Sequence, residues 1–372
     1  MLHNGQIEDA LEHGDNALKN DLPTANVIFT FAKALFDTKQ TEAAINAYDL
    51  GLAQDPNNIE GLYQLALLLQ SIGDQKGAVK RYTVLLQTDP DNAMALSNLS
   101  AATRITGALD EAVQCGERAL AIQPEFSDAH NNLGLALCAK GDSAKAIPHF
   151  EAALQITGTR YETLNNLGVA QQACGNFQDA EITLRQALSL ESSDITSPAA
   201  ERNLGNCLRQ MQRFDEAITY YSVALEKSPL DFATYGNLAL TLLNLNKAGD
   251  AILVYEKALS LNPYHAKLRK SLGIAQLLNG DFDEGWRNYE ARLEEHQSDH
   301  SRMRWDGQTR PKSLLVKAEQ GLGDTLQFCR YIPLLDDCAD EIFFECQPAL
   351  KELMGSLDQH VVIRSPEDPI IK

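Results

Sequence analysis

A small residue recurs along most of the chain at a fixed distance, and this period constrains the fold more than any other feature. Successive members are 34 residues apart, apart from one interval of 37 that places three extra residues around Ser192 to Pro198, where a surface loop tolerates insertion. Such a period is the signature of a repeat architecture, in which each unit buries its apolar side against the next. The series consists of Ala10, Ala44, Ala78, Ala112, Ala146, Ala180, Ala217, Ala251 and Gly285.

Each unit has the pattern of two amphipathic helices joined by a turn. Leu133 and Leu137 lie four residues apart on the first helix, and Ala146 and Phe150 continue at the same spacing on the second. Gly141 lies between them and supplies the turn. Small residues allow two helix backbones to approach closely. The unit is therefore predicted to be a hairpin of a helix A and a helix B.

The pattern resembles the tetratricopeptide repeat, in which a small residue, leucine, glycine, alanine, an aromatic residue and a closing proline recur with a period of 34. The resemblance covers about residues 1–299. It implies an all-α superhelical solenoid of about 8.5 repeats, which begins with a lone helix B through which two copies could associate. The eight full units are expected to begin near Asn26, Glu60, Met94, Asp128, Glu162, Ala199, Ala233 and Lys267.

One polar position on the predicted A helices indicates a ligand. Five consecutive units carry asparagine immediately before the leucine that recurs at the position of Leu133, and an asparagine amide can pair with a peptide backbone as donor and as acceptor. A helices about 10 Å apart match about three residues of extended chain. The column is similar to the asparagine ladder of the O-linked N-acetylglucosamine transferases, which implies an extended polypeptide partner in the concave groove. The alternative is that asparagine is merely common at this position. The predicted peptide-binding residues are Asn98, Asn132, Asn166, Asn203 and Asn237.

Charge and composition exclude several classes of function. The formal net charge is −19, which disfavours binding to nucleic acid or to anionic lipid. No stretch approaches the roughly 18 apolar residues of a membrane-spanning helix, and the first residues are unlike a signal peptide, so we expect a cytoplasmic protein. The seven cysteines form no Cys-x-x-Cys pair, and we expect no metal site, no disulfide framework and no cofactor. Those cysteines that fall within the repeats are expected to act as small hydrophobic residues.

The last part of the chain has a different pattern. Short apolar runs at Ser313–Ala318, Glu341–Cys346 and Val361–Ile363 alternate with two predicted helices, Thr325–Leu335 and Pro348–Leu357. A β-α-β-α-β order predicts a parallel sheet, part of a Rossmann-like α/β lobe, with ligands beyond the carboxyl ends of the strands. We expect the array at 1–299, a linker at 300–312 and this partial lobe at 313–372.

A glycine-containing turn follows the first of these strands. A dinucleotide-binding fingerprint would need glycine in place of Leu326, and a Walker loop would need Gly-Lys-Ser/Thr, so both are rejected. The residues alone favour Asp324 as a plain helix N-cap. The functional alternatives are an anion site at the backbone N–H groups and a general base toward a hydroxyl. The candidate acceptor or anion loop consists of Gly321, Gly323, Asp324 and Thr325.

The same region resembles the start of the glycosyltransferase domain that follows tetratricopeptide arrays in many bacterial proteins, a relative of the two-lobed heptosyltransferases. The resemblance implies that Gly323 and Asp324 face the acceptor, with Asp324 as the catalytic base. It also implies a nucleotide-sugar donor held mainly by a second lobe, for which the 60 residues from Ser313 onward are too few. The motifs that carry it are Trp305-Asp306-Gly307, Leu314-Leu315-Val316, Glu319 to Thr325, Gln327-Phe328, Arg330-Tyr331 and Glu345-Cys346-Gln347.

Two functions therefore remain open. The first is a tetratricopeptide glycosyltransferase of which this chain holds only part, so that residues 1–372 alone are expected to be inactive. The second is a non-enzymatic scaffold for protein interactions. An independent small-molecule enzyme is not supported, because the sequence offers no nucleophile, metal ligand set or paired carboxylates for one.

Overall fold

The computed structural model describes residues 24–190, 197–295, 305–319, 321–357 and 360–368. Contacts divide the chain into two compact units, Met1–Glu295 and His296–Lys372, and each is described by itself. The lone helix B expected before residue 24 and the first part of the expected linker lie outside the described residues. The limits of the array and linker therefore stay predictions.

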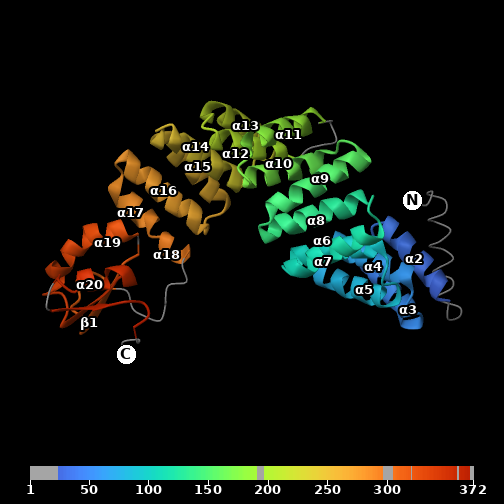
Figure 1. Ribbon diagram of the computed structural model, residues 1–372, viewed down its shortest axis with the longest axis horizontal. Coiled ribbons are helices and arrows are strands. Elements are labelled where there is room, and N and C mark those ends of the chain that lie inside the picture. The colour runs from blue at the N-terminus through green and yellow to red at the C-terminus, as the bar shows by residue number, and fades with distance from the viewer. Residues whose placement is uncertain (1–23, 191–196, 296–304, 320, 358–359, 369–372) are drawn as a thin grey trace. The chain divides into compact units, whose positions relative to one another are not determined.

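The first unit is a stack of helical hairpins (Figure 1). Each of the eight predicted units is present, and each A helix begins within one residue of its expected start. The A helices are α2 (Ala25–Asp37), α4 (Ile59–Ser71), α6 (Ala93–Thr106), α8 (Ser127–Lys140), α10 (Tyr161–Ala173), α12 (Ala199–Gln210), α14 (Phe232–Asn244) and α16 (Ala266–Asn279). The B helices are α3 (Thr41–Gln54), α5 (Gln75–Thr88), α7 (Leu109–Ile122), α9 (Ser143–Thr157), α11 (Phe177–Ser189), α13 (Phe214–Lys227), α15 (Ala248–Leu261) and α17 (Phe282–Tyr289), followed by α18 (Arg292–Glu295).

Local signals fix the ends of these helices. Asn58 and Asn92 cap α4 and α6, each accepting a hydrogen bond from the backbone N–H three residues later at 2.8 and 3.0 Å. Gly107 and Gly141 end α6 and α8 with φ of 89° and 93°, a left-handed conformation that glycine adopts without strain. Caps and turns at the same phase in successive units make the hairpins alike.

The periodic small residues lie where the two helices of a hairpin touch. Ala44, Ala78, Ala112, Ala146, Ala180, Ala217 and Ala251 are fully buried, whereas Ala10 lies outside the described residues. A Cβ atom on Gly134 would stand 2.7 Å from the Phe150 ring, and one on Gly205 would stand 2.7 Å from the Tyr221 ring. These two positions therefore exclude any larger side chain unless the ring moves.

The A helices also contact each other along the array. The contact is most extensive between α6 and α8, and weaker contacts join α8 to α10, α10 to α12, α12 to α14 and α14 to α16. The side chains on the exposed sides of these helices therefore form one continuous surface, which we call the A-helix face.

One tyrosine fixes the junction at the wider interval of the period. The Tyr161 hydroxyl, at the start of α10, donates to the Ser197 carbonyl at 2.9 Å and accepts from the Ala200 N–H at 3.1 Å. Tyr161 is buried, so both bonds are shielded from water. The entry to α12 is thereby attached directly to the preceding unit.

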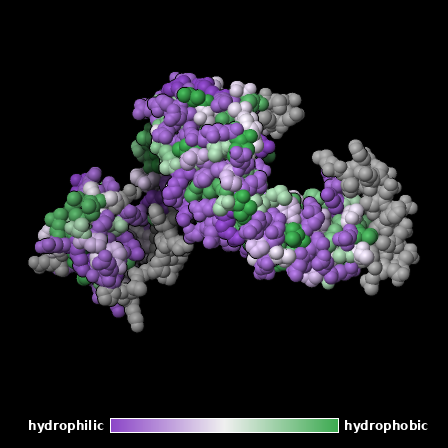
Figure 2. Space-filling view, turned by 45° about the vertical axis from the view of Figure 1, so that its right-hand side comes forward, coloured by the Kyte–Doolittle hydropathy of each residue, from purple (hydrophilic) through white to green (hydrophobic). Residues whose placement is uncertain are grey.

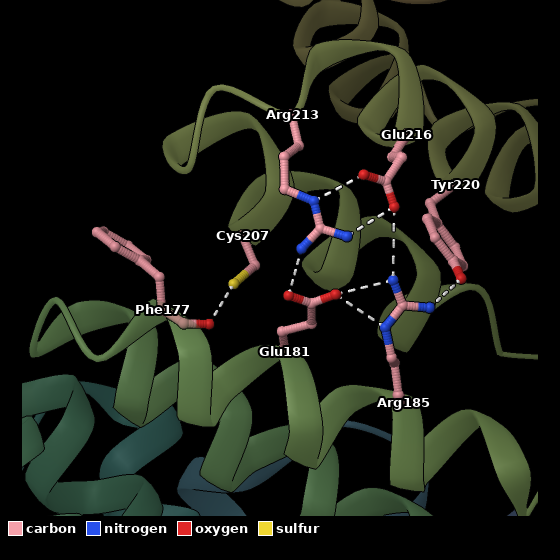
Figure 3. A network of polar contacts seen from close by, with 7 residues as sticks. All are labelled: Phe177, Glu181, Arg185, Cys207, Arg213, Glu216 and Tyr220. Carbon is pink, nitrogen blue, oxygen red and sulfur yellow. Dashed lines mark hydrogen bonds and ion pairs between the residues drawn. The ribbon is translucent and has the colours of Figure 1, made fainter.

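A network of charged groups joins B helices α11 and α13 on the same side of the array (Figure 3). The Arg213 guanidinium, just before α13, contacts Glu181 on α11 at 2.5 Å and is held by both oxygens of Glu216 at 2.6 and 2.7 Å. Arg185 donates to Glu181 at 2.8 Å and to the Tyr220 hydroxyl at 2.7 Å. Two arginines and two glutamates thus balance each other, and the network holds two units together without a net charge.

The second unit contains a three-stranded parallel sheet in the order β1-β2-β3, with all three predicted strands present. Leu314 pairs with Ile342, which pairs with Val361, and the three lie together in the core of this unit. The Rossmann-like description stays a prediction. The elements are β1 (Ser313–Lys317), α19 (Leu322–Phe328), η1 (Cys329–Leu335), β2 (Glu341–Glu345), η2 (Pro348–Leu350), α20 (Lys351–Met354) and β3 (Val361–Arg364).

The predicted N-cap of the first helix is wrong. The helix α19 begins at Leu322 rather than Thr325, so Gly321 occupies the cap position and Asp324 lies inside the first turn. A carboxylate in the first turn interacts favourably with the helix dipole, which explains Asp324 as well as a cap would. The helix continues as the 3-10 helix η1, where Pro333 has no N–H for an α-helical hydrogen bond.

The described residues on the face shown in Figure 2 are mainly hydrophilic. Exposed apolar side chains gather on α19 and η1 of the second unit, at Leu322, Leu326, Phe328, Tyr331 and Leu334. Among the helices that the structure describes, none combines the length and the hydropathy needed to cross a bilayer.

We expect the Arg213–Glu216 pair to make the stability of the array depend on pH. Hydrogen bonds from Arg213 hold the pKa of the Glu216 carboxyl below its ordinary value of 4.5. A lowered pKa in the folded state stabilises the protein above the unfolded value and loses this effect as the pH falls. Glu216→Gln should therefore lower the urea midpoint at neutral pH, and the difference from wild type should disappear well below pH 4.5.

The control is Glu226→Gln, which alters an exposed carboxylate on the same helix. This variant should leave the urea midpoint close to that of wild type at both pH values. A deficit of Glu216→Gln that persists in acid would show that the effect does not come from the charge of the carboxylate.

Candidate functional site

The predicted asparagines form a column of one residue on each of five successive A helices. They lie on α6, α8, α10, α12 and α14, and each side chain is partly buried. The structure thus brings the five residues together at equivalent positions of the A-helix face. They are Asn98, Asn132, Asn166, Asn203 and Asn237.

Each amide nitrogen of the column donates a hydrogen bond to the preceding A helix. The partners are Tyr63 Oη at 3.1 Å for Asn98, Ser97 O and Oγ at 3.2 and 3.0 Å for Asn132, Asn131 Oδ1 at 3.2 Å for Asn166, Asn165 Oδ1 at 2.8 Å for Asn203, and Asn206 Oδ1 at 3.0 Å for Asn237. The first four partners share one position, immediately before the column residue of the preceding unit. The column therefore links six successive A helices, from α4 to α14.

These bonds orient the amides. The Ser97 carbonyl can only accept, so the atom of Asn132 that faces it is the amide nitrogen. Within the described part of the chain, none of the five side-chain carbonyl oxygens accepts a hydrogen bond. Each asparagine thus retains its acceptor oxygen for another partner. Sequence reasoning missed the links between units, although the polar residue before each column position was a signal for them.

An aliphatic column runs beside the asparagines, three residues further along six of the eight A helices. Val169, Leu240 and Ile274 are exposed by 39%, 38% and 37%, which is high for apolar side chains within a stack. Leu67, Ala101 and Leu135 occupy the same position in earlier units and are half-buried, whereas Asn206 interrupts the series. The A-helix face is thus made of an amide column and an aliphatic column. Sequence analysis did not single out the second, whose period of 34 was visible.

A cavity of about 370 Å³ lies in the second unit near the carboxyl end of β1. Asp324 and Thr325 line it, together with Lys317, Glu319, Phe328 and Tyr331, whereas Gly321 and Gly323 are not among the lining residues. The Thr325 hydroxyl is already engaged, because it lies 3.3 Å from the Gly321 carbonyl and 3.0 Å from Gln347 Oε1. Of the predicted loop, Asp324 and Thr325 are thus the two residues that line the cavity.

Two buried cysteines of the array, Cys115 and Cys207, have the character of core thiols. Burial raises the pKa of both Cys115 and Cys207 to about 11, so these thiols stay protonated at neutral pH. All seven cysteines are free. Among the described residues, no three His, Cys, Asp or Glu side chains are grouped so as to hold a metal ion.

We expect the amide column to stabilise the stack. Asn132→Ala removes the two hydrogen bonds to Ser97 and should lower the free energy of unfolding by about 1–3 kcal/mol, at about 0.5–1.5 kcal/mol for each bond. Urea unfolding followed by circular dichroism measures this change. Asn46→Ala, at an exposed position on α3, is the matched control and should be near neutral. Equal effects of the two substitutions would contradict a linking role for Asn132.

Comparison with known proteins gives the family of the array. The tetratricopeptide repeat models match residues 60–92, 92–123, 125–192, 198–231 and 232–265. These matches lie within the array and leave the glycosyltransferase resemblance untested.

Curated relatives match parts of the array. The protein FlbA of Caulobacter vibrioides is 27% identical over a match that covers 35% of this chain and 29% of the relative. Hsp70-Hsp90 organizing protein 3 of Arabidopsis thaliana is 27% identical over 38% of this chain and 25% of its own length. The peroxisomal targeting signal receptor of Kluyveromyces lactis is 29% identical over 27% of this chain and 18% of its own length. The chain therefore spans less than a third of each of these relatives.

Solved structures share the fold. The Cut9–Hcn1 structure of the APC/C covers 79% of this chain and 56% of its own, with a TM-score of 0.55 and 17% identity. A tetratricopeptide repeat protein from Parabacteroides merdae covers 64% of this chain and all of its own, with a TM-score of 0.50 and 13% identity. With repeat models matching unit after unit and the helical hairpins in phase with the alanine series, the chain belongs to the tetratricopeptide repeat family.

Proposed function

We propose that the array binds an extended segment of polypeptide along its A-helix face. The observation that carries this proposal is the column of Asn98, Asn132, Asn166, Asn203 and Asn237, whose carbonyl oxygens are all left without a partner among the described residues. A row of identical acceptors at equivalent positions suits a ligand that presents identical groups at regular intervals, and a polypeptide backbone is such a ligand. The aliphatic column beside it offers apolar contact for side chains.

The relatives and the charge support the same class of partner. One relative is named as an Hsp70-Hsp90 organizing protein and another as a peroxisomal targeting signal receptor. The net charge of −19 disfavours nucleic acid. On this proposal the array is an interaction scaffold, and we place its action in the cytoplasm.

The test of this proposal measures peptide binding by a variant of the column. Peptides selected on the wild-type chain from a random linear library are assayed by fluorescence anisotropy. The triple substitution Asn132→Ala, Asn166→Ala and Asn203→Ala should weaken binding at least about tenfold, because each lost hydrogen bond costs about 1 kcal/mol. Urea unfolding of the same sample establishes that the stack is still folded.

The control for the triple variant removes three amides from the B helices instead. Asn46→Ala, Gln114→Ala and Gln186→Ala alter exposed positions on α3, α7 and α11, and this variant should bind like wild type. Unchanged affinity of the folded column variant, or equal losses in both variants, would contradict the proposal.

The cavity at Asp324 supports a second candidate function, the glycosyltransferase chemistry implied by the resemblance. Asp324 lines a cavity beside the carboxyl end of β1, where parallel α/β sheets place their ligands, and a carboxylate there can act as a base toward an acceptor hydroxyl. The chain of 372 residues alone is expected to be inactive. Transfer of labelled sugar from nucleotide donors to polypeptide is therefore measured for wild type and Asp324→Asn. Transfer that the substitution abolishes would show an enzyme and would contradict the expectation.

A further inference from the structure

The repeat distance of the A-helix face restricts the conformation of the chain that it can bind. Each asparagine of the column bridges directly to the preceding A helix at 2.8 to 3.2 Å, so consecutive acceptors are one helix apart. Packed helices lie about 8–10 Å from each other. A ligand that meets every acceptor in the same way must therefore repeat its own geometry at about this distance.

A β-strand does not repeat at that distance. Its side chains and N–H groups return to the same side every two residues, or about 6.6–6.8 Å, so a strand in register with one asparagine is out of register with the next. A polyproline II helix has three residues per turn and a rise of about 3.1 Å, which gives a repeat of about 9.3 Å. Its backbone N–H and C=O groups make no internal hydrogen bonds and remain free to pair with a partner.

We propose that the A-helix face recognises a polyproline II segment with one residue that is not proline in every triplet. This inference rests on the proposed function and names the class of polypeptide bound. The residue that is not proline donates its backbone N–H to the free oxygen of an asparagine such as Asn132. Proline suits the other two places, because no N–H group is needed there. Its ring also fixes φ in advance, which reduces the entropy lost on binding.

The aliphatic column fits the same ligand. A three-residue helix has three faces, so when one faces the amides an adjacent one faces Leu135, Val169 and Leu240. Proline rings on that face would cover side chains that are exposed in the array alone, such as Val169 and Leu240 at 39% and 38%. The third face of the ligand remains in solvent. Hydrogen bonds thus fix the triplet register and apolar contact adds affinity.

The experiment compares three labelled peptides of equal length by fluorescence anisotropy. The first repeats Ala-Pro-Pro, with one triplet for each asparagine of the column. The second replaces each alanine with N-methylalanine, which removes the N–H group. The third alternates valine and threonine and favours an extended strand. We expect the first to bind, the second to bind at least about tenfold more weakly, since each lost bond is worth about 1 kcal/mol, and the third to bind more weakly than the first.

Variants of the aliphatic column complete the test. Val169→Gln should weaken binding of the Ala-Pro-Pro peptide about threefold to tenfold, because a polar group replaces exposed apolar surface that the ligand would bury. Leu253→Gln, at a position 66% exposed on B helix α15, should have no effect. Both sites are exposed, so neither substitution disturbs the core.

The outcomes separate this inference from the proposed function. Equal binding of the N-methylated peptide, or stronger binding of the alternating peptide, would overturn the polyproline II conformation while polypeptide binding stands. If library peptides bind through the asparagine column and the Ala-Pro-Pro peptide does not, the polyproline II conformation is likewise overturned and polypeptide binding stands. Failure of every peptide, including those from the library, would overturn both proposals.

Discussion

The close contact between the A and B helices of each hairpin determines the rest of the array. It requires a side chain no larger than a methyl group where the helices touch, and Ala44 through Ala251 are fully buried at that point. A ring such as that of Phe150 lies against a glycine of the facing helix and excludes a Cβ there. A constraint that is met once per hairpin produces units of nearly identical shape. In a stack of such units, the residues at one outward-facing position of successive hairpins lie in a row.

The candidate site is a consequence of this repetition. The asparagine column is not gathered by a loop or a cleft, because each residue stands on its own helix and the stacking of hairpins aligns them. The same amides serve the fold, since their nitrogens hold the preceding helix. A residue that both links units and presents an acceptor keeps the spacing of the acceptors fixed. Recognition by such a column therefore depends on the geometry of the stack as much as on the amide group.

Periodicity made most of the array predictable, because each repeat indicates the helix boundaries again, so an error in one unit is not carried into the next. The starts of α4 and α8 follow from Glu60 and Asp128, each one residue inside the helix. The bond from Asn132 to Ser97 was not predictable, because it depends on the rotation of one hairpin relative to the next, which the sequence does not state. Outside the repeats the prediction was weaker. The strands of the second unit follow from apolar runs such as Glu341–Glu345, but the position of Asp324 depended on where a single turn of helix begins.

The bridge made by Tyr161 makes the packing of α12 independent of the length of the connection that leads into it. Its hydroxyl holds Ser197 and Ala200 at the entry to α12, and α10 packs on α12 directly. The position of α12 on α10 therefore does not depend on the number of residues that connect α11 to α12. Evolution can lengthen this connection in frame, and a protein engineer can place an epitope tag or a fluorophore in it, while the phase of the hairpins on both sides is kept.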